Sequence, residues 1–156
     1  MPRALHMLLL VFAAGISPVL HAVDTEEQTS AATRDPDYAA GKKAVETRNW
    51  NAAIKSFSSA ALRDPDNADL QNYLGFSYRR LGQLEPALKH YQRALTLNPR
   101  HRGAHEYIGE AYLMAGDLAN ARKHLDELRK ICLLPCEELA DLDRKIAEYV
   151  KKVGSR

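Results

Sequence analysis

Residues 68–101 carry the sequence ADLQNYLGFSYRRLGQLEPALKHYQRALTLNPRH, and this stretch determines the fold of the chain. Its apolar residues recur every three or four positions in two runs, 70–81 and 84–95, which is the spacing of two amphipathic helices. Gly82 separates the runs, and glycine at this point supplies the left-handed backbone conformation that ends a helix at little cost. Pro99 closes the stretch. The sequence therefore predicts a helix, a tight turn and a second helix.

The same pattern recurs on both sides of this stretch at an interval of 34 residues. The recurring sets are Gly41, Gly75 and Gly109; Ala44, Tyr78 and Tyr112; Ala53, Ala87 and Ala121; and Phe57, Tyr91 and Leu125. A period of this length indicates a solenoid, in which each helix pair buries its apolar face against its neighbours. Because the residues at two of these positions are small, Gly75 and Ala87 should let the two helices of a unit approach closely.

Residues 34–135 resemble three tetratricopeptide repeats (TPRs), and residues 68–101 match the family pattern best. The resemblance implies an all-α fold, a TPR helix-turn-helix solenoid in which three helix pairs form a right-handed superhelix. We assign the repeats to residues 34–67, 68–101 and 102–135.

The first and third repeats depart from the family pattern. In the first, Asp37 and Ala40 stand where an aromatic and a large apolar residue are usual, so its first helix is expected to be the least secure. In the third, Leu128 replaces a small residue, and no proline closes the repeat before Pro135. We therefore expect the second helix of the third repeat to run a little long.

Residues 136–152 (CEELADLDRKIAEYVKK) predict one more amphipathic helix after the last repeat. Its apolar face holds Leu139, Leu142, Ile146 and Tyr149. Because the end of a solenoid would otherwise expose apolar surface, we interpret this segment as a capping helix. A helix that docks into a partner is the alternative interpretation.

Residues 1–22 have the features of a secretory signal peptide. Arg3 precedes an apolar run at 7–20 (MLLLVFAAGISPVL) that is about six residues shorter than a bilayer-spanning helix, and Ala22 suits the position before a cleavage site. An uncleaved anchor is the alternative. The polar segment 23–33 is expected to be a flexible linker.

The location predicted from this N-terminus is the bacterial periplasm. The chain contains no Asn-x-Ser/Thr acceptor for glycosylation, which favours a periplasmic over a eukaryotic secretory route. We therefore expect an exported, periplasmic (secreted) protein with no stable membrane insertion after the signal peptide is cleaved.

The composition excludes several classes of function. Lys and Arg number 22 against 20 Asp and Glu, so the formal net charge is only +2 and no nucleic-acid binding through phosphate neutralisation is expected. No phosphate-binding loop, activated-serine motif or HExxH motif is present, so neither an enzyme nor a cofactor is expected. His101 and His105 are four residues apart, but the loop between repeats falls between them, and we interpret them as surface histidines rather than metal ligands.

Cys132 and Cys136 are the only cysteines. In an oxidising compartment we expect a local disulfide between them, which would fix the C-terminal helix to the third repeat. Two alternatives remain open. The thiols with His124 hold Cu(I) or perform redox chemistry, which would make the chain a thiol-redox or copper-handling accessory protein. In the other alternative the two thiols are separate and inert.

The family resemblance also implies a binding surface, because the first helix of each TPR lines a concave groove. The groove residues implied here are Asp35, Tyr38, Lys42, Val45, Glu46, Asp69, Asn72, Phe76, Arg79, Arg80, Glu106, Glu110, Leu113 and Met114. From this set we predict that the partner is contacted by Tyr38, Lys42, Phe76, Arg79, Arg80, Glu110, Leu113 and Met114.

Exposed apolar side chains beside two arginines suit a peptide with apolar anchors and an acidic group. The alternative is that Arg79 and Arg80 pair with Glu46, Glu106 or Glu110 inside the groove. The sequence thus predicts an adaptor or scaffold of the bacterial cell envelope that binds a protein or peptide segment. The clamp that other TPR domains use for the C-terminal carboxylate of cytosolic chaperones is not expected, because its positions hold Tyr38, Lys42, Tyr73, Gly103 and Tyr107.

Overall fold

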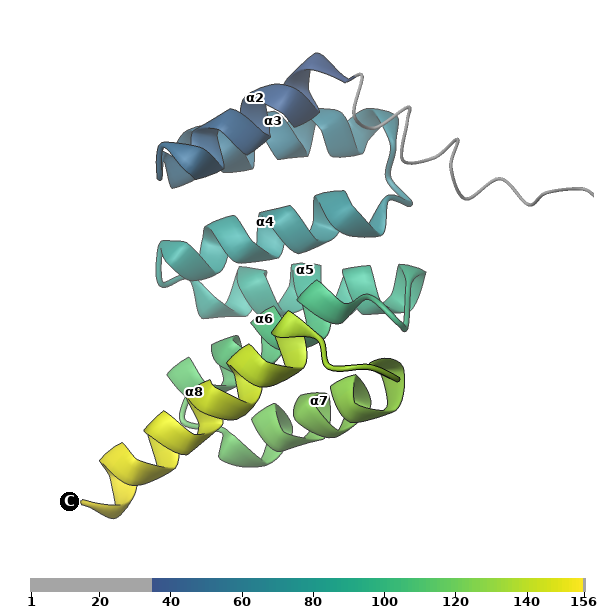
Figure 1. Cartoon of the computed structure of the whole chain (residues 1–156). Helices are drawn as coiled ribbons and strands as arrows, with labels where there is room; N and C mark the ends of the chain where they lie inside the picture. The colour runs from purple at the N-terminus through teal and green to yellow at the C-terminus, as the bar shows by residue number, and fades with distance from the viewer. Residues whose placement is uncertain (1–34, 156) are drawn as a thin grey trace, which may run out of the picture.

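The computed structural model describes residues 35–155 (Figure 1). The signal peptide predicted at 1–22 and the linker predicted at 23–33 lie outside the described residues. The described part of the chain folds into seven α-helices and contains no strand. They are α2 (Pro36–Glu46), α3 (Trp50–Arg63), α4 (Ala68–Arg80), α5 (Leu84–Leu97), α6 (Arg102–Met114), α7 (Leu118–Ile131) and α8 (Glu137–Gly154). The predicted all-α fold of three helix pairs and a C-terminal helix is therefore confirmed.

The helices stack in chain order, so that each pair packs on the next (Figure 1). Helix α2 packs on α3, α4 on α5, and α6 on α7, while α3 against α4 and α5 against α6 join successive pairs. Helix α8 packs against α6 and α7 at the end of the stack, where a capping helix was expected. Among residues 35–155, no helix is both long and apolar enough to cross a membrane.

The turns inside the three helix pairs share one backbone geometry. Gly82 and Gly116 have φ angles of 75° and 81°, in the left-handed region where glycine carries no steric cost. The predicted role of Gly82 is thus confirmed. In the first pair the equivalent residue is Arg48, with a φ angle of 56°, which is an uncommon conformation for a residue with a side chain.

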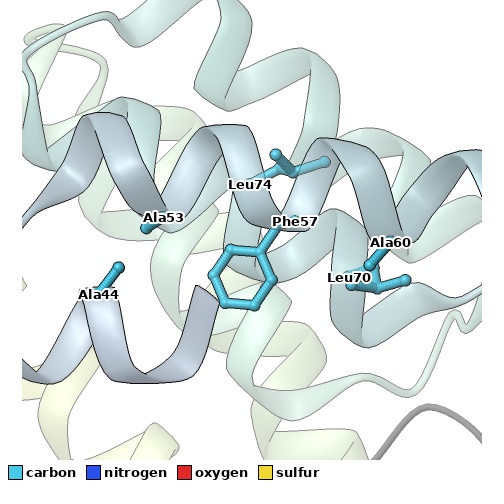
Figure 2. Packing of buried hydrophobic residues seen from close by; sticks show 6 residues of the cluster. All are labelled: Ala44, Ala53, Phe57, Ala60, Leu70 and Leu74. Atoms are coloured by element: carbon cyan, nitrogen blue, oxygen red, sulfur yellow. The ribbon is translucent and has the colours of Figure 1, made fainter. Parts of the chain in front are cut away.

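Close approach of helices inside each unit depends on the recurring glycines, as predicted. A Cβ atom on Gly41 would lie 2.5 Å from the Phe57 ring, and one on Gly75 would lie 2.6 Å from the Tyr91 ring. The Phe57 ring is fully buried in the cluster with Ala44, Ala53, Ala60, Leu70 and Leu74 that Figure 2 shows. The aromatic rings of the first two units therefore fill the space that each glycine leaves.

The third unit fills that space differently. Leu125 stands where the first two units have the Phe57 and Tyr91 rings. A Cβ atom on Gly109 would lie 2.7 Å from Leu142 of α8. Leu142 is fully buried with Leu125 and Leu128 in the last core cluster. Helix α8 is thus a part of the hydrophobic core, because the Leu142 side chain takes the place of the aromatic ring that the third repeat lacks.

Two expectations about helix length have different outcomes. Helix α2 has 11 residues, against 13 in α4 and in α6, and the expectation that it is the least secure helix stays a prediction. The expectation that the second helix of the third repeat runs long is wrong, because α3, α5 and α7 all have 14 residues. Helix α7 ends at Ile131, and the extended backbone of Cys132 turns the chain toward α8.

Candidate functional site

A row of aromatic side chains runs across the first two helix pairs and reaches the third. The Trp50 and Phe76 rings lie 5.8 Å apart edge to face, and the Phe76 and Tyr107 rings lie 5.2 Å apart. All three rings are half-buried, so one part of each remains open to solvent. We call Trp50, Phe76 and Tyr107 the aromatic row. It is placed by α3, α4 and α6, and it provides large apolar contact area on a rigid support.

Arg80 covers one end of the aromatic row. Its guanidinium lies 4.7 Å from the centre of the Trp50 ring and 5.8 Å from that of Phe76, within the range of cation–π attraction. The side chain is exposed, and its stacking on two rings holds it in place. Arg80 therefore presents preorganised hydrogen-bond donors of the kind that bind carboxylates in pairs.

Arg79 has a different position and a different role. It is only 7% exposed, pairs with the Glu110 carboxylate, and donates from Nε to the Tyr91 hydroxyl at 3.2 Å. Its guanidinium also lies 5.5 Å from the centre of the Phe76 ring. The interior pairing that the sequence left open as an alternative thus describes Arg79. Its charge is used inside the protein, and it is not a free clamp for an acidic partner.

The side chains at the C-terminal end of α6 form a cleft with α8. The cleft has a volume of about 370 Å³ and is lined by Arg79, Glu110, Leu113, Met114, Lys145, Glu148, Tyr149 and Lys152. We call it the α6–α8 cleft. Met114 is 53% exposed at its edge, whereas Leu113 is buried in the core. The structure therefore brings four of the predicted groove residues together and adds four from α8.

Tyr38 and Lys42 lie at the other end of the stack. The Lys42 ammonium donates to the Tyr73 hydroxyl at 2.6 Å and lies 4.8 Å from the centre of the Tyr73 ring. The Tyr38 ring packs edge-on against Tyr73 and Phe57, at 5.9 Å and 6.0 Å between centroids. Tyr38 is therefore half-buried against the core of the first unit, and Lys42 is the more accessible of the two.

A second, polar cavity lies at the N-terminal ends of α4, α6 and α8. It has a volume of about 350 Å³ and is lined by Asp69, Asn72, Tyr73, His101, Gly103, Glu106, Tyr107, Glu137, Glu138 and Asp141. We call it the acidic pocket. Glu106 is 8% exposed, and burial, followed by the negative charges of neighbouring carboxylates, raises its pKa to about 7. The sequence placed Glu106 on the groove but gave no sign of the pocket.

His101, His105 and His124 have structural partners. His101 caps α6, because its Nδ1 accepts from the Ala104 amide, and its Nε2 donates to Asp69 at 3.0 Å. His105 and His124 share a hydrogen bond between their Nδ1 atoms at 3.0 Å, and His105 is buried rather than on the surface as expected. Burial lowers the pKa of His124 to about 4, with a further contribution from His105. The described residues hold no group of three or more His, Cys, Asp or Glu side chains arranged to bind a metal.

The two cysteines lie at the junction of α7 and α8. Cys132 follows the last residue of α7, Cys136 precedes α8, and their sulfur atoms are at bonding distance, 2.05 Å apart. Leu133 and Leu134 between them are exposed. The pair therefore closes the short connection between the third unit and the capping helix.

Several residues of the site were missed by the sequence interpretation. Trp50 is the only tryptophan and begins a second helix, so the groove geometry of the family did not include it. Lys145, Tyr149 and Lys152 belong to α8, which was interpreted as a capping helix, with a helix that docks into a partner as the alternative. Their positions depend on the angle at which α8 docks, and no spacing rule in the sequence fixes that angle.

Comparisons with known proteins agree with this architecture. Residues 68–101 and residues 104–131 each match a family model described as tetratricopeptide repeat. No curated protein matches the sequence at a significant level.

Solved structures with a similar fold include the TPR2B domain of yeast Sti1 in a complex with pHsp70, with a TM-score of 0.69, 16% identity, and coverage of 81% of this chain and 98% of that chain. The translocator chaperone SycD of Yersinia enterocolitica gives a TM-score of 0.70 at 17% identity, with coverage of 80% and 88%. The first TPR of Spaghetti (RPAP3) bound to the HSP90 peptide SRMEEVD gives 0.63 at 23% identity, with coverage of 71% and 87%. At these identities the similarity establishes the fold.

Proposed function

We propose that this chain, whose residues 68–101 and 104–131 match tetratricopeptide repeat models, is a non-enzymatic adaptor that binds a protein or peptide segment on the face formed by the aromatic row and the α6–α8 cleft. The observation that carries the proposal is the half-buried row of Trp50, Phe76 and Tyr107 with Arg80 stacked on it. Aromatic and arginine side chains held in place are the residues that contribute most to protein interfaces. Similar folds bind peptides, as with the HSP90 peptide on Spaghetti (RPAP3).

The polar requirement of the partner follows from the two arginines. Arg79 is neutralised by Glu110, so Arg80 is the arginine available to an acidic group of the partner. Met114 and Tyr149 in the α6–α8 cleft supply apolar contacts, and Lys145 and Lys152 flank them. A segment with an apolar anchor and a nearby carboxylate fits this surface.

We propose that the protein works in the bacterial cell envelope after export. The support is the predicted signal peptide together with the two cysteines, whose sulfur atoms are at bonding distance. Mass spectrometry of protein from the exporting cell, without reduction, measures both features. Cleavage after Ala22 and the absence of free thiols are expected, and a full-length chain in the cytosol with two free thiols contradicts this location.

The partner is tested by crosslinking and capture from the exporting cell, followed by titration of the captured protein against purified variants. Phe76→Ala should weaken binding by about thirtyfold, because loss of a central aromatic contact costs about 2 kcal/mol or more. Its matched control is Leu62→Ala, which removes an exposed apolar side chain from α3. Equal losses for the two variants would show that the aromatic row is not the binding surface.

Arg80 has a matched control of its own. Arg80→Ala should weaken binding, whereas Arg122→Ala, an exposed arginine on α7, should not. Each variant lowers the net charge by the same amount, so a difference between them reports the position of the charge. Equal effects would indicate long-range electrostatic attraction instead of a contact at Arg80.

The competing hypothesis, a thiol-redox or copper-handling accessory protein, is tested on the cysteines. Cys132→Ser should leave partner binding intact if the pair is structural. Loss of cellular activity with unchanged stability, or tight stoichiometric Cu(I) binding by the reduced protein, would favour the redox or copper function.

A further inference from the structure

The acidic pocket lies where the N-terminal turns of three helices meet. Asp69 of α4, Gly103 of α6 and Glu137 of α8 are separated by 34 residues each and occupy equivalent positions. The middle one has no side chain, so a space opens between the two carboxylates. A Cβ atom at Gly103 would lie 3.4 Å from Asn72 Nδ2, which is ordinary contact, so the backbone does not require glycine at this position.

Part of the negative charge in the pocket has a structural explanation. Acidic residues in the first turn of a helix stabilise it, which accounts for Asp69 and Glu137. Asp69 also accepts from His101 Nε2, and the Glu138 carboxylate lies 3.6 Å from the Arg102 guanidinium. Asn72 and Glu106 have no such explanation, since both lie beyond the first turn of their helices.

Asn72 is the clearest sign of a missing ligand. The residue is 7% exposed, lines the pocket, and its Oδ1 atom is buried with no hydrogen-bond partner among the described residues. A buried acceptor without a donor is costly, and such atoms are rare in folded proteins. A donor that enters the pocket would satisfy Asn72.

Glu106 adds a buried carboxylate next to this acceptor. It occupies the same repeat position as Asn72, one unit further along, and is 8% exposed. The charges that act on it are mostly negative: Glu110 on its own helix, and Asp141 and Glu138 on α8. No side-chain donor in residues 35–155 forms a hydrogen bond with Glu106, so acceptors outnumber donors around this cavity.

We propose that the acidic pocket binds the guanidinium group of an arginine side chain in the partner segment. Guanidinium carries a positive charge and five N–H donors in one plane, which suits several carboxylates and an amide oxygen spread around a cavity of about 350 Å³. A metal ion is less suitable, because no group of three ligating side chains is arranged for one in the described residues. The inference rests on the proposed peptide-binding role of this face, and it adds a basic residue to the expected partner.

The two charged regions would also orient the partner. The acidic pocket lies at the N-terminal ends of α4, α6 and α8, whereas Arg80 is the last residue of α4, Lys145 lies at the middle of α8 and Lys152 lies near its C-terminal end. A bound segment would place its arginine at one end and its carboxylate at the other. Reversal of the segment would bring like charges together, which disfavours it.

The test uses a blocked tetra-arginine peptide as the probe and the intact protein, with NMR detection of the Asn72 side-chain amide. We expect a saturable shift of the Asn72 signals with tetra-arginine, a weaker effect with tetralysine, and none with the citrulline version. Citrulline has nearly the shape of arginine but no charge, so its result separates charge recognition from shape. A shift elsewhere on the protein with no change at Asn72 would overturn the proposal.

Variants separate the pocket from general electrostatic attraction. Glu106→Gln should weaken tetra-arginine binding about tenfold, because glutamine keeps one acceptor oxygen but loses the negative charge that strengthens a hydrogen bond to guanidinium. Glu85→Gln, on the exposed side of α5, changes the net charge equally and should have no comparable effect. Gly103→Met fills the pocket without a change of charge and should also abolish binding in protein that circular dichroism shows to be folded. Equal weakening by Glu106→Gln and Glu85→Gln would refute the arginine site.

These results are distinguishable from a failure of the proposed function. If Phe76→Ala abolishes binding of the captured partner while Glu106→Gln has no effect on it and the probe does not shift Asn72, the groove proposal stands and the arginine site is wrong. If tetra-arginine binds at Asn72 but Phe76→Ala has no effect on partner binding, the pocket stands and the groove proposal is wrong.

Discussion

Replacement of Glu106 by glutamine should stabilise the folded protein at neutral and alkaline pH and have little effect in acid. Glu106 is 8% exposed, and burial followed by the charges of Glu110, Asp141 and Glu138 raises its pKa from 4.5 to about 7, against an opposing effect of Arg79. At high pH the folded protein therefore holds an unfavourable buried charge. Glutamine has nearly the same shape and carries no charge, so it removes this penalty.

The sign and size of the effect follow from proton linkage. Between pH 4.5 and about pH 7 the folded protein keeps a proton on Glu106 that the unfolded chain has released, so the contribution of Glu106 to the free energy of unfolding falls as pH rises. One pKa unit corresponds to about 1.4 kcal/mol, and the whole shift therefore sets an upper limit of about 3 kcal/mol. Because the acidic pocket admits water, we expect a gain of about 1 to 3 kcal/mol for the variant above pH 7.

The assay is urea unfolding of wild type, Glu106→Gln and Glu85→Gln at about pH 4, 6 and 8. The difference between Glu106→Gln and wild type should grow from pH 4 to pH 8, whereas the difference for Glu85→Gln should stay flat. The histidines contribute equally to wild type and to each variant, so their contribution cancels in the difference between the two free energies of unfolding. The argument that the buried Glu106 charge is unfavourable would be refuted by a variant that is less stable than wild type at every pH. A variant that is more stable than wild type by the same amount at every pH would refute it as well.

Three further predictions concern the core, the histidine pair and the cysteines. Gly75→Ala should lower the free energy of unfolding by about 1 kcal/mol or more, because its Cβ would lie 2.6 Å from the buried Tyr91 ring; a thermal melt that rises instead would contradict the close packing. Burial and His105 lower the pKa of His124 to about 4, so protonation of His124 should destabilise the fold as pH falls below 6.5, and the stability of His124→Gln relative to wild type should rise as pH falls through this range in thermal melts. Cys132→Ser should lower stability by about 2 kcal/mol or less, measured by unfolding without reductant, and an unchanged value would show that no disulfide constrains the chain.

The fold was predictable because the repeat period places small and large residues at fixed positions. Gly75 and Tyr91 recur as a pair, so their contact follows once two helices per unit are assigned. The third unit shows the limit of this reasoning. Its missing aromatic ring is replaced by Leu142 of α8, and a segment outside the repeat carries no periodic signal for its partner.

The sequence named candidate site residues without separating their environments. Phe76 is half-buried and Arg80 is exposed, whereas Arg79, the neighbour of Arg80 in sequence, is buried and paired with Glu110. Their contact with a partner stays a prediction. Successive residues on a helix point about 100° apart, so two adjacent arginines face different surroundings. The rotation of α4 about its axis decides which of the two reaches solvent, and the repeat pattern does not fix that rotation closely enough. The contact of Asn72 with the acidic pocket depends in addition on where α8 docks.

Helix α8 has two roles that are coupled through its faces. Leu142 packs on Gly109 and completes the core, while Asp141 one position earlier lines the acidic pocket and Tyr149 two turns later lines the α6–α8 cleft. Deletion of α8 would therefore expose the apolar face of the third unit and remove a wall of both cavities at once. Loss of binding after such a deletion would not locate the site. A single substitution in the lining of the α6–α8 cleft, such as Lys145→Ala, leaves the Leu142 contact in place, so its effect on partner binding reports the cleft alone.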